Sequence, residues 1–193
     1  MKKKLLLHSC CAPCLTSVYE QLIPTYDIVV FWYNPNIWPR EEHDKRLGVL
    51  QNYCHKIGAE LVLANYEYEL EHKTWLKLIE GAENEAEGGP RCTKCFELRL
   101  LYTAKAAVAG DFDFFASELT VSPHKNAKII NKLGLVIQDR LPKLTTRLSH
   151  KYPQYLVSDF KKNDGFKRSV EICKEHNIYR QSYCGCEYSA QRK

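Results

Sequence analysis

Short runs of apolar residues alternate along the chain with longer stretches in which apolar residues recur every three to four positions. The run at residues 27–33 is dense in β-branched and aromatic residues, which is typical of a strand. The short runs predict strands at residues 4–8, 27–33, 60–64, 112–116 and 155–158. The longer stretches have the helical period. They predict helices at residues 14–22, 40–57, 65–81, 93–109, 122–133 and 165–176.

Strands that alternate with helices of this length predict an α/β fold of the three-layer, Rossmann-like kind. Its sheet is mostly parallel and has helices on both faces. No repeat or linker divides the sequence, so we expect residues 1–193 to form a single domain. In such sheets the working residues lie at the carboxyl ends of the strands. Cys10, Cys11 and Cys14 follow the first predicted strand, and Asn34 and Asn36 follow the second.

The composition is that of an ordinary globular protein, with 45% hydrophobic and 26% charged residues, which excludes disordered and fibrous classes. No run approaches the ~18 apolar residues of a membrane span. The apolar stretch Leu5–Leu7 is too short for a signal peptide, so we expect a cytoplasmic protein without membrane contact. A net charge of +5 permits contact with a phosphate backbone but does not require it.

Nine cysteines are unusual for a cytoplasmic chain. Disulfide frameworks belong to oxidising compartments, so thiols in a reducing cell more often bind metal or carry out redox chemistry. Periodicity assigns two of the nine to the core. Cys54 continues the apolar stripe of Leu47 and Leu50, and Cys173 follows Phe166 and Val170.

The other seven cysteines lie in three clusters, none of which has a helical apolar stripe. The clusters are Cys10-Cys11-Ala12-Pro13-Cys14, Cys92-Thr93-Lys94-Cys95 and Cys184-Gly185-Cys186. The first cluster lies at a strand-to-helix turn, and the second follows a Gly-rich loop and begins a helix, where backbone N–H groups stabilise thiolates. If they meet, Cys10, Cys11, Cys92 and Cys95 supply four thiolates, which suit either zinc or an iron–sulphur cluster. The adjacent pair Cys10-Cys11 modestly favours the larger iron–sulphur cubane.

The Cys184-Gly185-Cys186 element has two interpretations. Cysteines one residue apart can close a strained disulfide, and strained exposed disulfides are the reactive ones. The same pair can instead chelate a metal, with Cys14 as a third thiolate. Either interpretation predicts a role in turnover.

Five motifs in this order resemble the QueH family of epoxyqueuosine reductases over nearly the whole chain. They are residues 8–14 (HSCCAPC), 31–40 (FWYNPNIWPR), 91–99 (RCTKCFELR), 121–123 (VSP) and 179–189 (YRQSYCGCEYS). The resemblance implies a fold of the PP-loop and adenine-nucleotide-hydrolase (HUP-like) kind. It implies a cobalamin-independent oxidoreductase that reduces epoxyqueuosine in tRNA to queuosine, a two-electron deoxygenation that ends queuosine biosynthesis.

The resemblance also implies roles for single residues. Cys10, Cys11, Cys92 and Cys95 would hold a [4Fe–4S] cluster. Cys184 and Cys186 would form a redox-active pair or bind a second, mononuclear iron. Cys14, which stands where some members of the family have Asp, would be a further ligand of that iron. Electrons would come from a donor such as ferredoxin or flavodoxin.

Residues around the clusters have competing interpretations. Tyr33, Asn34 and Asn36 are candidates to stack on or hydrogen-bond the modified base in the anticodon loop, or they merely cap the second strand. His8 is a proton donor or, as we favour, a histidine satisfied at a strand end. A rival from another class is a zinc-stapled RNA-binding module without catalysis. An ATP-dependent thiolation enzyme is disfavoured, because the segment after the first strand has no glycine to cradle phosphate.

Overall fold

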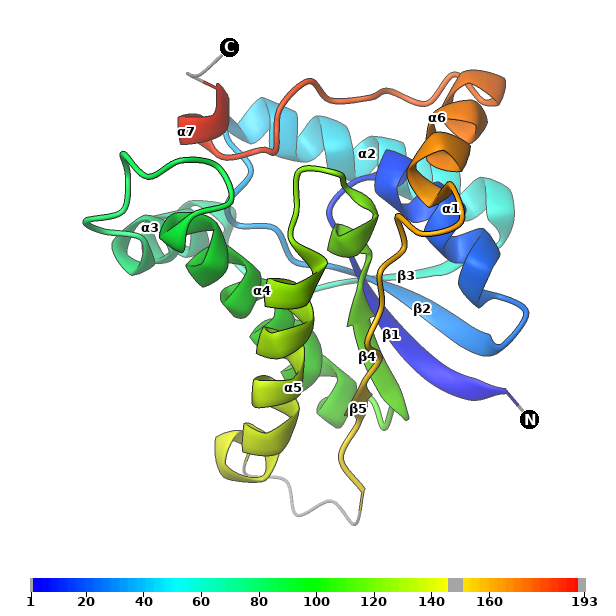
Figure 1. The fold of residues 1–193 in the computed structure, drawn as a ribbon, viewed down its shortest axis with the longest axis horizontal. Coiled ribbons are helices and arrows are strands. Elements are labelled where there is room, and N and C mark those ends of the chain that lie inside the picture. Colours follow the sequence, from blue (N-terminus) through cyan, green and yellow to red (C-terminus); the bar gives the residue numbers. More distant parts are fainter. Residues whose placement is uncertain (1, 146–150, 191–193) are drawn as a thin grey trace.

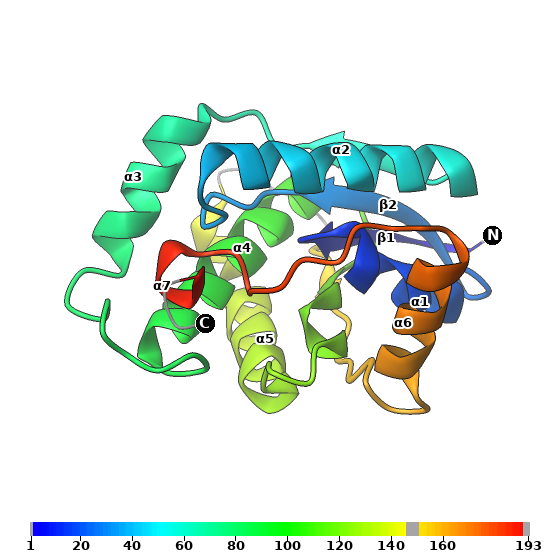
Figure 2. The same cartoon turned by 90° about the horizontal axis from the view of Figure 1, so that it is seen from above.

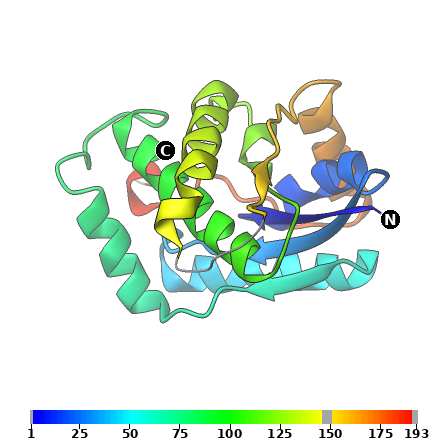
Figure 3. The same ribbon diagram turned by 90° about the horizontal axis from the view of Figure 1, so that it is seen from below.

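Five parallel strands form one sheet in the order β3-β2-β1-β4-β5. The computed structural model describes residues 2–145 and 151–190 (Figure 1). The strands are β1 (Lys3–Ser9), β2 (Tyr26–Trp32), β3 (Glu60–Leu63), β4 (Phe114–Ser117) and β5 (Gln154–Tyr155). The edge strands β3 and β5 lie on opposite sides of β1 (Figure 3). The predicted parallel sheet is confirmed.

Seven α-helices and one 3-10 helix surround the sheet in the described residues. They are α1 (Ala12–Leu22), α2 (Arg40–Ile57), α3 (Tyr68–Leu78), α4 (Pro90–Ala109), η1 (Glu118–Val121), α5 (Ala127–Leu144), α6 (Gly165–Glu175) and α7 (Glu187–Ala190). Helices α4 and α5 pack on one face of the sheet, while α1 and α2 cover the other face and α6 packs on α1 (Figure 1). The predicted three-layer arrangement is therefore confirmed.

The central strand β1 explains why helices cover both faces. Leu5 and Leu7 are fully buried in the core cluster beneath α1, and Leu6 is buried in the cluster beneath α4. A strand with apolar residues on both faces needs a helix layer on each, as parallel sheets generally do. Among the described residues, no helix is both long and apolar enough to cross a membrane.

Helix α5 is longer than the prediction, which ended it at residue 133. It continues through Gly134 to Leu144. A Cβ at position 134 would lie 2.4 Å from ring carbons of Tyr155. This glycine therefore serves the close packing of α5 against β5 and does not end the helix. Strand β5 is correspondingly shorter than predicted, at Gln154–Tyr155 in place of 155–158.

Two short helices, η1 and α7, were not predicted from the sequence, and both lie beside cysteine clusters. The stripe assigned to the last long helix also needs correction. Cys173 is buried, as predicted, but Phe166 is 37% exposed, because α6 packs through Ser169, Ile172 and Cys173. The buried face of α6 thus lies one residue earlier in the sequence than the predicted stripe, which contained Phe166.

Candidate active site

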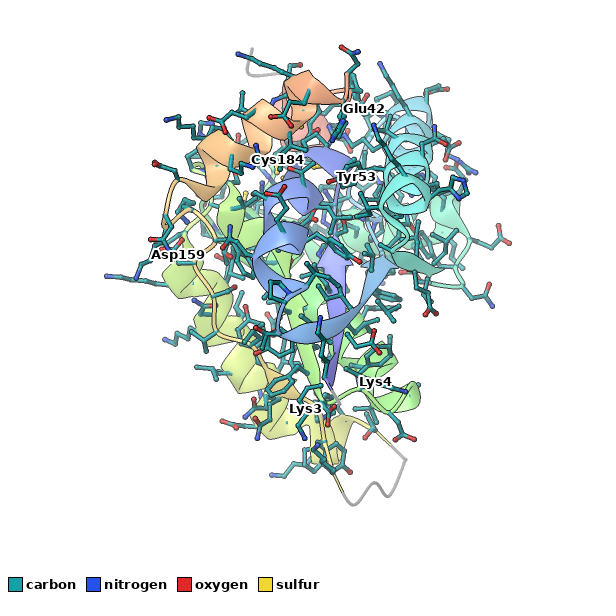
Figure 4. The ribbon with its side chains drawn as sticks, turned by 90° about the vertical axis from the view of Figure 1, so that its right-hand side faces the viewer. Lys3, Lys4, Glu42, Tyr53, Asp159 and Cys184 are labelled. Carbon is teal, nitrogen blue, oxygen red and sulfur yellow. The ribbon has the colours of Figure 1, made fainter. Side chains whose placement is uncertain are left out.

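The cysteine-rich end of the molecule is the carboxyl end of the sheet. Cys10 and Cys11 directly follow β1, and Glu118 directly follows β4, the neighbouring strand. Figure 4 shows Cys184 at this end, far from Lys3 and Lys4 at the start of β1. The topology therefore places the site where open α/β sheets bind their ligands.

The first group consists of three thiols and one carboxylate. The ligand atoms of Cys10, Cys11, Cys14 and Glu118 all lie within 4.8 Å of one another. Glu118, which is fully buried, accepts hydrogen bonds at Oε1 from the backbone N–H groups of Cys10 (2.7 Å) and Cys11 (3.2 Å). The carboxylate thus holds the turn between β1 and α1 in the shape that brings the thiols together.

The three thiols are strongly coupled. Burial raises the pKa of the Cys11 thiol, but hydrogen bonds from Cys10 and Cys14 outweigh burial and hold that pKa well below its usual value. Hydrogen bonds to Cys10 and Cys11, together with burial, raise the pKa of Cys14 well above its usual value. One of the three thiols therefore loses its proton readily, whereas a second or third thiolate would be repelled by the first. A bound cation would relieve that repulsion.

The second group lies at the start of α4. Cys92 and Cys95 are on its first turns, and the Cys92 sulphur accepts the backbone N–H of Gly88 at 3.2 Å. Burial raises the pKa of both thiols, that of Cys95 to about 11. These two cysteines line an inner cavity together with Cys184 and Cys186.

Cys184 connects the two groups. It lines the inner cavity and also an outer cavity of about 360 Å³, whose wall includes Cys10 and Cys14. Cys10, Cys11 and Cys92 share one hydrophobic core cluster. The structure therefore brings all three predicted clusters to one end of the sheet, while Cys54 and Cys173 are buried elsewhere, each 2% exposed.

Buried donors without partners face the inner cavity. Within the described residues, the side-chain atoms Arg99 Nη2, Arg91 Nη2 and Trp75 Nε1 have no hydrogen-bond partner. Burial lowers the pKa of Arg99, but electrostatic interaction with the neighbouring thiol groups, first that of Cys95, outweighs burial and raises it, so this buried guanidinium stays charged. Unpaired buried donors are costly. Together with the thiols, they suit an anionic, sulphur-rich group.

Comparison with known proteins decides the family. The family model described as "Epoxyqueuosine reductase QueH" matches residues 5–192. The chain belongs to the QueH family.

Individual QueH relatives agree with this assignment. An epoxyqueuosine reductase QueH from Staphylococcus epidermidis is 42% identical over 196 residues, which cover 100% of this chain and 78% of the relative. One from Streptococcus pyogenes serotype M1 is 42% identical over 193 residues (99% and 72% coverage). The QueH protein of Thermotoga maritima is 30% identical over 185 residues (95% and 88%).

A solved structure shares the fold. The U34-tRNA thiolase NcsA from Methanococcus maripaludis, solved with its [4Fe–4S] cluster, has a TM-score of 0.50 and 13% sequence identity. The match covers 98% of this QueH chain but only 62% of the thiolase chain. The likeness shows a shared fold and agrees with the predicted three-layer α/β fold with a parallel sheet.

The C-terminal segment of this QueH chain is anchored by an arginine that sequence reasoning missed. Figure 2 shows the segment running across the molecule from α6 to α7. Arg46, only 1% exposed, donates to the carbonyl oxygens of Cys184 (3.0 Å) and Tyr183 (3.2 Å) and to Glu42 (2.7 Å). Gly185 has a φ of +137°, which favours glycine, and its carbonyl accepts the N–H of Trp38 at 2.8 Å.

The other predicted QueH site residues lie in different surroundings. Tyr33 is fully buried. Its ring stacks on that of Tyr102 with 3.9 Å between the ring centroids, and its hydroxyl donates to the Glu71 carboxylate. Asn34 is fully buried and donates to the carbonyl of Ser9 at 2.8 Å. Their substrate-binding roles stay predictions. In this structure the two residues make packing and hydrogen-bond contacts at the carboxyl end of β2.

Asn36 and His8 differ from that pair. Asn36 lines the inner cavity with the cysteines, and within the described residues its buried Oδ1 has no partner. His8 is fully buried between Ser117 Oγ (2.9 Å) and the carbonyl of Tyr33 (3.2 Å). Burial lowers its pKa to about 3. His8 is therefore neutral and satisfied, as the favoured interpretation holds.

Proposed function

We propose that this chain reduces epoxyqueuosine in tRNA to queuosine, and that Cys10, Cys11, Cys92 and Cys95 hold a [4Fe–4S] cluster while it does so. The observation that carries the proposal is the convergence of seven thiols from three distant segments at one end of the sheet, in a chain of the QueH family. The orphaned donors of Arg91, Arg99 and Trp75 support it, since they would meet the sulphides of such a cluster.

The reaction sets requirements that the chain must meet. Deoxygenating an epoxide takes up two electrons and two protons; both C–O bonds break, the oxygen leaves as water and an alkene forms. A [4Fe–4S] cluster supplies electrons one at a time when bound. A second redox element is therefore needed, and Cys184 with Cys186 is our candidate, either as a redox pair or, with Cys14, as ligands of a second iron.

Lys125 meets the requirement for a proton. Its side chain lines the outer cavity with Cys10, Cys14 and Cys184. Burial lowers the pKa of Lys125, but electrostatic interaction with the thiol groups of Cys184, Cys10 and Cys14 outweighs burial and raises it. The ammonium at Nζ therefore holds a proton beside the thiols, ready for the departing oxygen.

The partners follow from the same proposal. The tRNA would present its modified anticodon base to the outer cavity, where Cys184 and Lys125 lie. The electron donor would be a ferredoxin or flavodoxin, for which an artificial reductant substitutes in an assay. The alternative of a zinc-stapled module without catalysis is not favoured, because the relatives are named as reductases.

The test begins with anaerobic purification and measurement of iron, sulphide and zinc. We expect a brown protein with about four irons per chain for the cubane alone, and about five with a second iron. Turnover is then followed by nucleoside analysis of tRNA containing epoxyqueuosine. Replacing Cys184 and Cys186 by serine should abolish turnover, while Cys54→Ser, at a buried core thiol, should not. A colourless zinc protein, or near-normal turnover without Cys184 and Cys186, would overturn the proposal.

A further inference from the structure

One exposed aromatic side chain stands at the wall of the outer cavity. Phe166 is the second residue of α6 and is 37% exposed, although the sequence pattern placed it in the core. Helix α6 packs on α1 through Ser169, Ile172 and Cys173, so Phe166 is left on the cavity side. Core packing therefore does not account for this phenylalanine.

An arginine lies over the same ring. The guanidinium carbon of Arg180 is 5.6 Å from the ring centroid of Phe166, within the range of a cation–π contact. Arg180 also lines the outer cavity and is exposed. Its Nη1 donates to the sulphur of Cys173 at 3.7 Å, but in the part of the chain that the structure describes it forms no ion pair with a carboxylate. Its charge is thus available to a ligand.

The cavity joins this pair to the reactive thiols. Its lining includes Phe166 and Arg180 at exposed positions and Cys10, Cys14 and Cys184 at more buried ones. Among the described residues that line the cavity, Glu87 is the one carboxylate, against the cations Lys125 and Arg180. Proteins bind unpaired bases of RNA on aromatic rings and guanidinium planes beside positive charge.

We propose that Phe166 and Arg180 form a stacking platform for a nucleobase that neighbours the modified nucleotide in the anticodon loop. The inference rests on the proposed function for the identity of the RNA. Phe166 supplies the ring on which one face of the base stacks. Arg180 contacts the phosphate of that nucleotide or the other face of the base. The platform holds the loop while the modified base extends past it toward Cys184.

The test is RNA binding by the anaerobically purified holoprotein. A fluorescent anticodon stem–loop carrying epoxyqueuosine is titrated, and binding is measured by anisotropy. We expect Phe166→Ala to weaken binding about tenfold, and Phe166→Tyr to restore it. Arg180→Lys, which keeps the charge but loses the plane, should weaken binding by a smaller factor. Leu70→Ala and Arg140→Lys, at exposed positions outside the cavity, serve as controls.

Abasic loops identify the stacked base. When one nucleotide beside the modified position loses its base, Phe166→Ala should cause no further loss of binding to that RNA. Binding by Phe166→Ala equal to wild type, or the same loss on every abasic loop, would overturn the platform. If the wild-type protein binds the stem–loop but does not reduce it, the proposed function fails and the platform stands. If the wild type does not bind the RNA, both fail. Unchanged visible absorbance shows that a variant retains its cluster.

Discussion

The guanidinium of Arg46 donates a hydrogen bond of 3.0 Å to the carbonyl oxygen of Cys184, 138 residues later in the chain. The same side chain bonds the carbonyl of Tyr183 and the carboxylate of Glu42, and it is only 1% exposed. One buried cation in α2 therefore helps to anchor the C-terminal cysteine segment, together with the bond from the Trp38 N–H to the Gly185 carbonyl. Long-range anchoring of this kind would keep Cys184 beside both cavities.

Replacing Arg46 by alanine should destabilise the fold. It leaves Glu42 without its ion-pair partner and two carbonyls without donors, which costs about 3 kcal/mol in the free energy of unfolding. Turnover should fall as well, because Cys184 loses its anchor. Urea unfolding measures the first effect. Arg40→Ala is the control, since Arg40 lies on the same helix in an exposed pair with Asp44, and it should cost much less than Arg46→Ala because exposed ion pairs contribute little. Similar losses for the two variants would contradict the anchoring role.

Gly185→Ala should damage the site through the backbone. Gly185 has a φ of +137°, and a Cβ there would lie 3.0 Å from Arg46 Nη1 and 3.2 Å from Ile37 Cγ1. We expect a loss of about 1–3 kcal/mol in unfolding free energy and a marked loss of turnover. Gly48→Ala is the matched control, because beyond its chain neighbours and the surrounding backbone of α2 no described heavy atom lies within 4 Å of a Cβ at that position. In the middle of α2 it should stabilise by roughly 0.5–1 kcal/mol. Normal turnover by Gly185→Ala would show that the segment adjusts freely.

The sequence predicted elements well where local signals decide them. Helix α2 was predicted at residues 40–57 and is observed at Arg40–Ile57, because Gly58 ends it in the left-handed conformation at φ +66°. The prediction was wrong for α5, where Gly134 follows an apolar stripe in the same way. There the glycine is required by the ring of Tyr155, a contact that no local pattern reveals.

The same distinction applies to the site. The cysteines were identified from the sequence, because thiols outside apolar stripes are conspicuous. Glu118 was missed, since its partners Cys10 and Cys11 are more than 100 positions away. Arg46 was missed for the same reason. Phe166 was placed in the core because periodicity cannot distinguish two adjacent helix positions when the packing partner is unknown.

His43 should make stability depend on pH. Its Nε2 accepts from Trp32 Nε1 (3.2 Å) and from the Tyr66 hydroxyl (3.0 Å), and its Nδ1 bonds Asp44 (2.8 Å). Burial lowers the pKa of His43 below its ordinary 6.5 despite Asp44. The unfolded chain therefore takes up a proton near pH 6.5 that the folded chain does not, and stability falls as the pH falls below that value.

His43→Gln should remove this contribution. The difference in unfolding free energy between wild type and variant should be constant above pH 7 and shrink below about pH 6.5, by at most about 1.4 kcal/mol per pH unit. Urea unfolding at half-unit steps from pH 5 to pH 8 measures it. Because other histidines are present in both proteins, their titration cancels in the difference. Parallel curves across this range would refute the assignment to His43.

Substitutions of Glu118 can distinguish a role in positioning the thiols from a role as a metal ligand. Its Oε1 accepts two backbone N–H groups, from Cys10 and Cys11, and among the described residues its Oε2 is buried without a partner. Glu118→Ala leaves both N–H groups unpaired, at about 1–3 kcal/mol each, and should lower both stability and iron content. Glu118→Gln keeps a carbonyl oxygen for these bonds, so a positioning role predicts that iron per chain and visible absorbance are largely retained.

Direct ligation by Glu118 predicts the opposite, because an amide is a much weaker metal ligand than a carboxylate, and the glutamine variant would then lose iron as the alanine variant does. Glu41→Ala, at an exposed carboxylate on α2, is the control for nonspecific effects. Full iron content and wild-type stability in Glu118→Ala would exclude both roles. We expect the glutamine variant to resemble wild type, because the observed hydrogen bonds already engage Glu118 with the backbone that shapes the turn after β1.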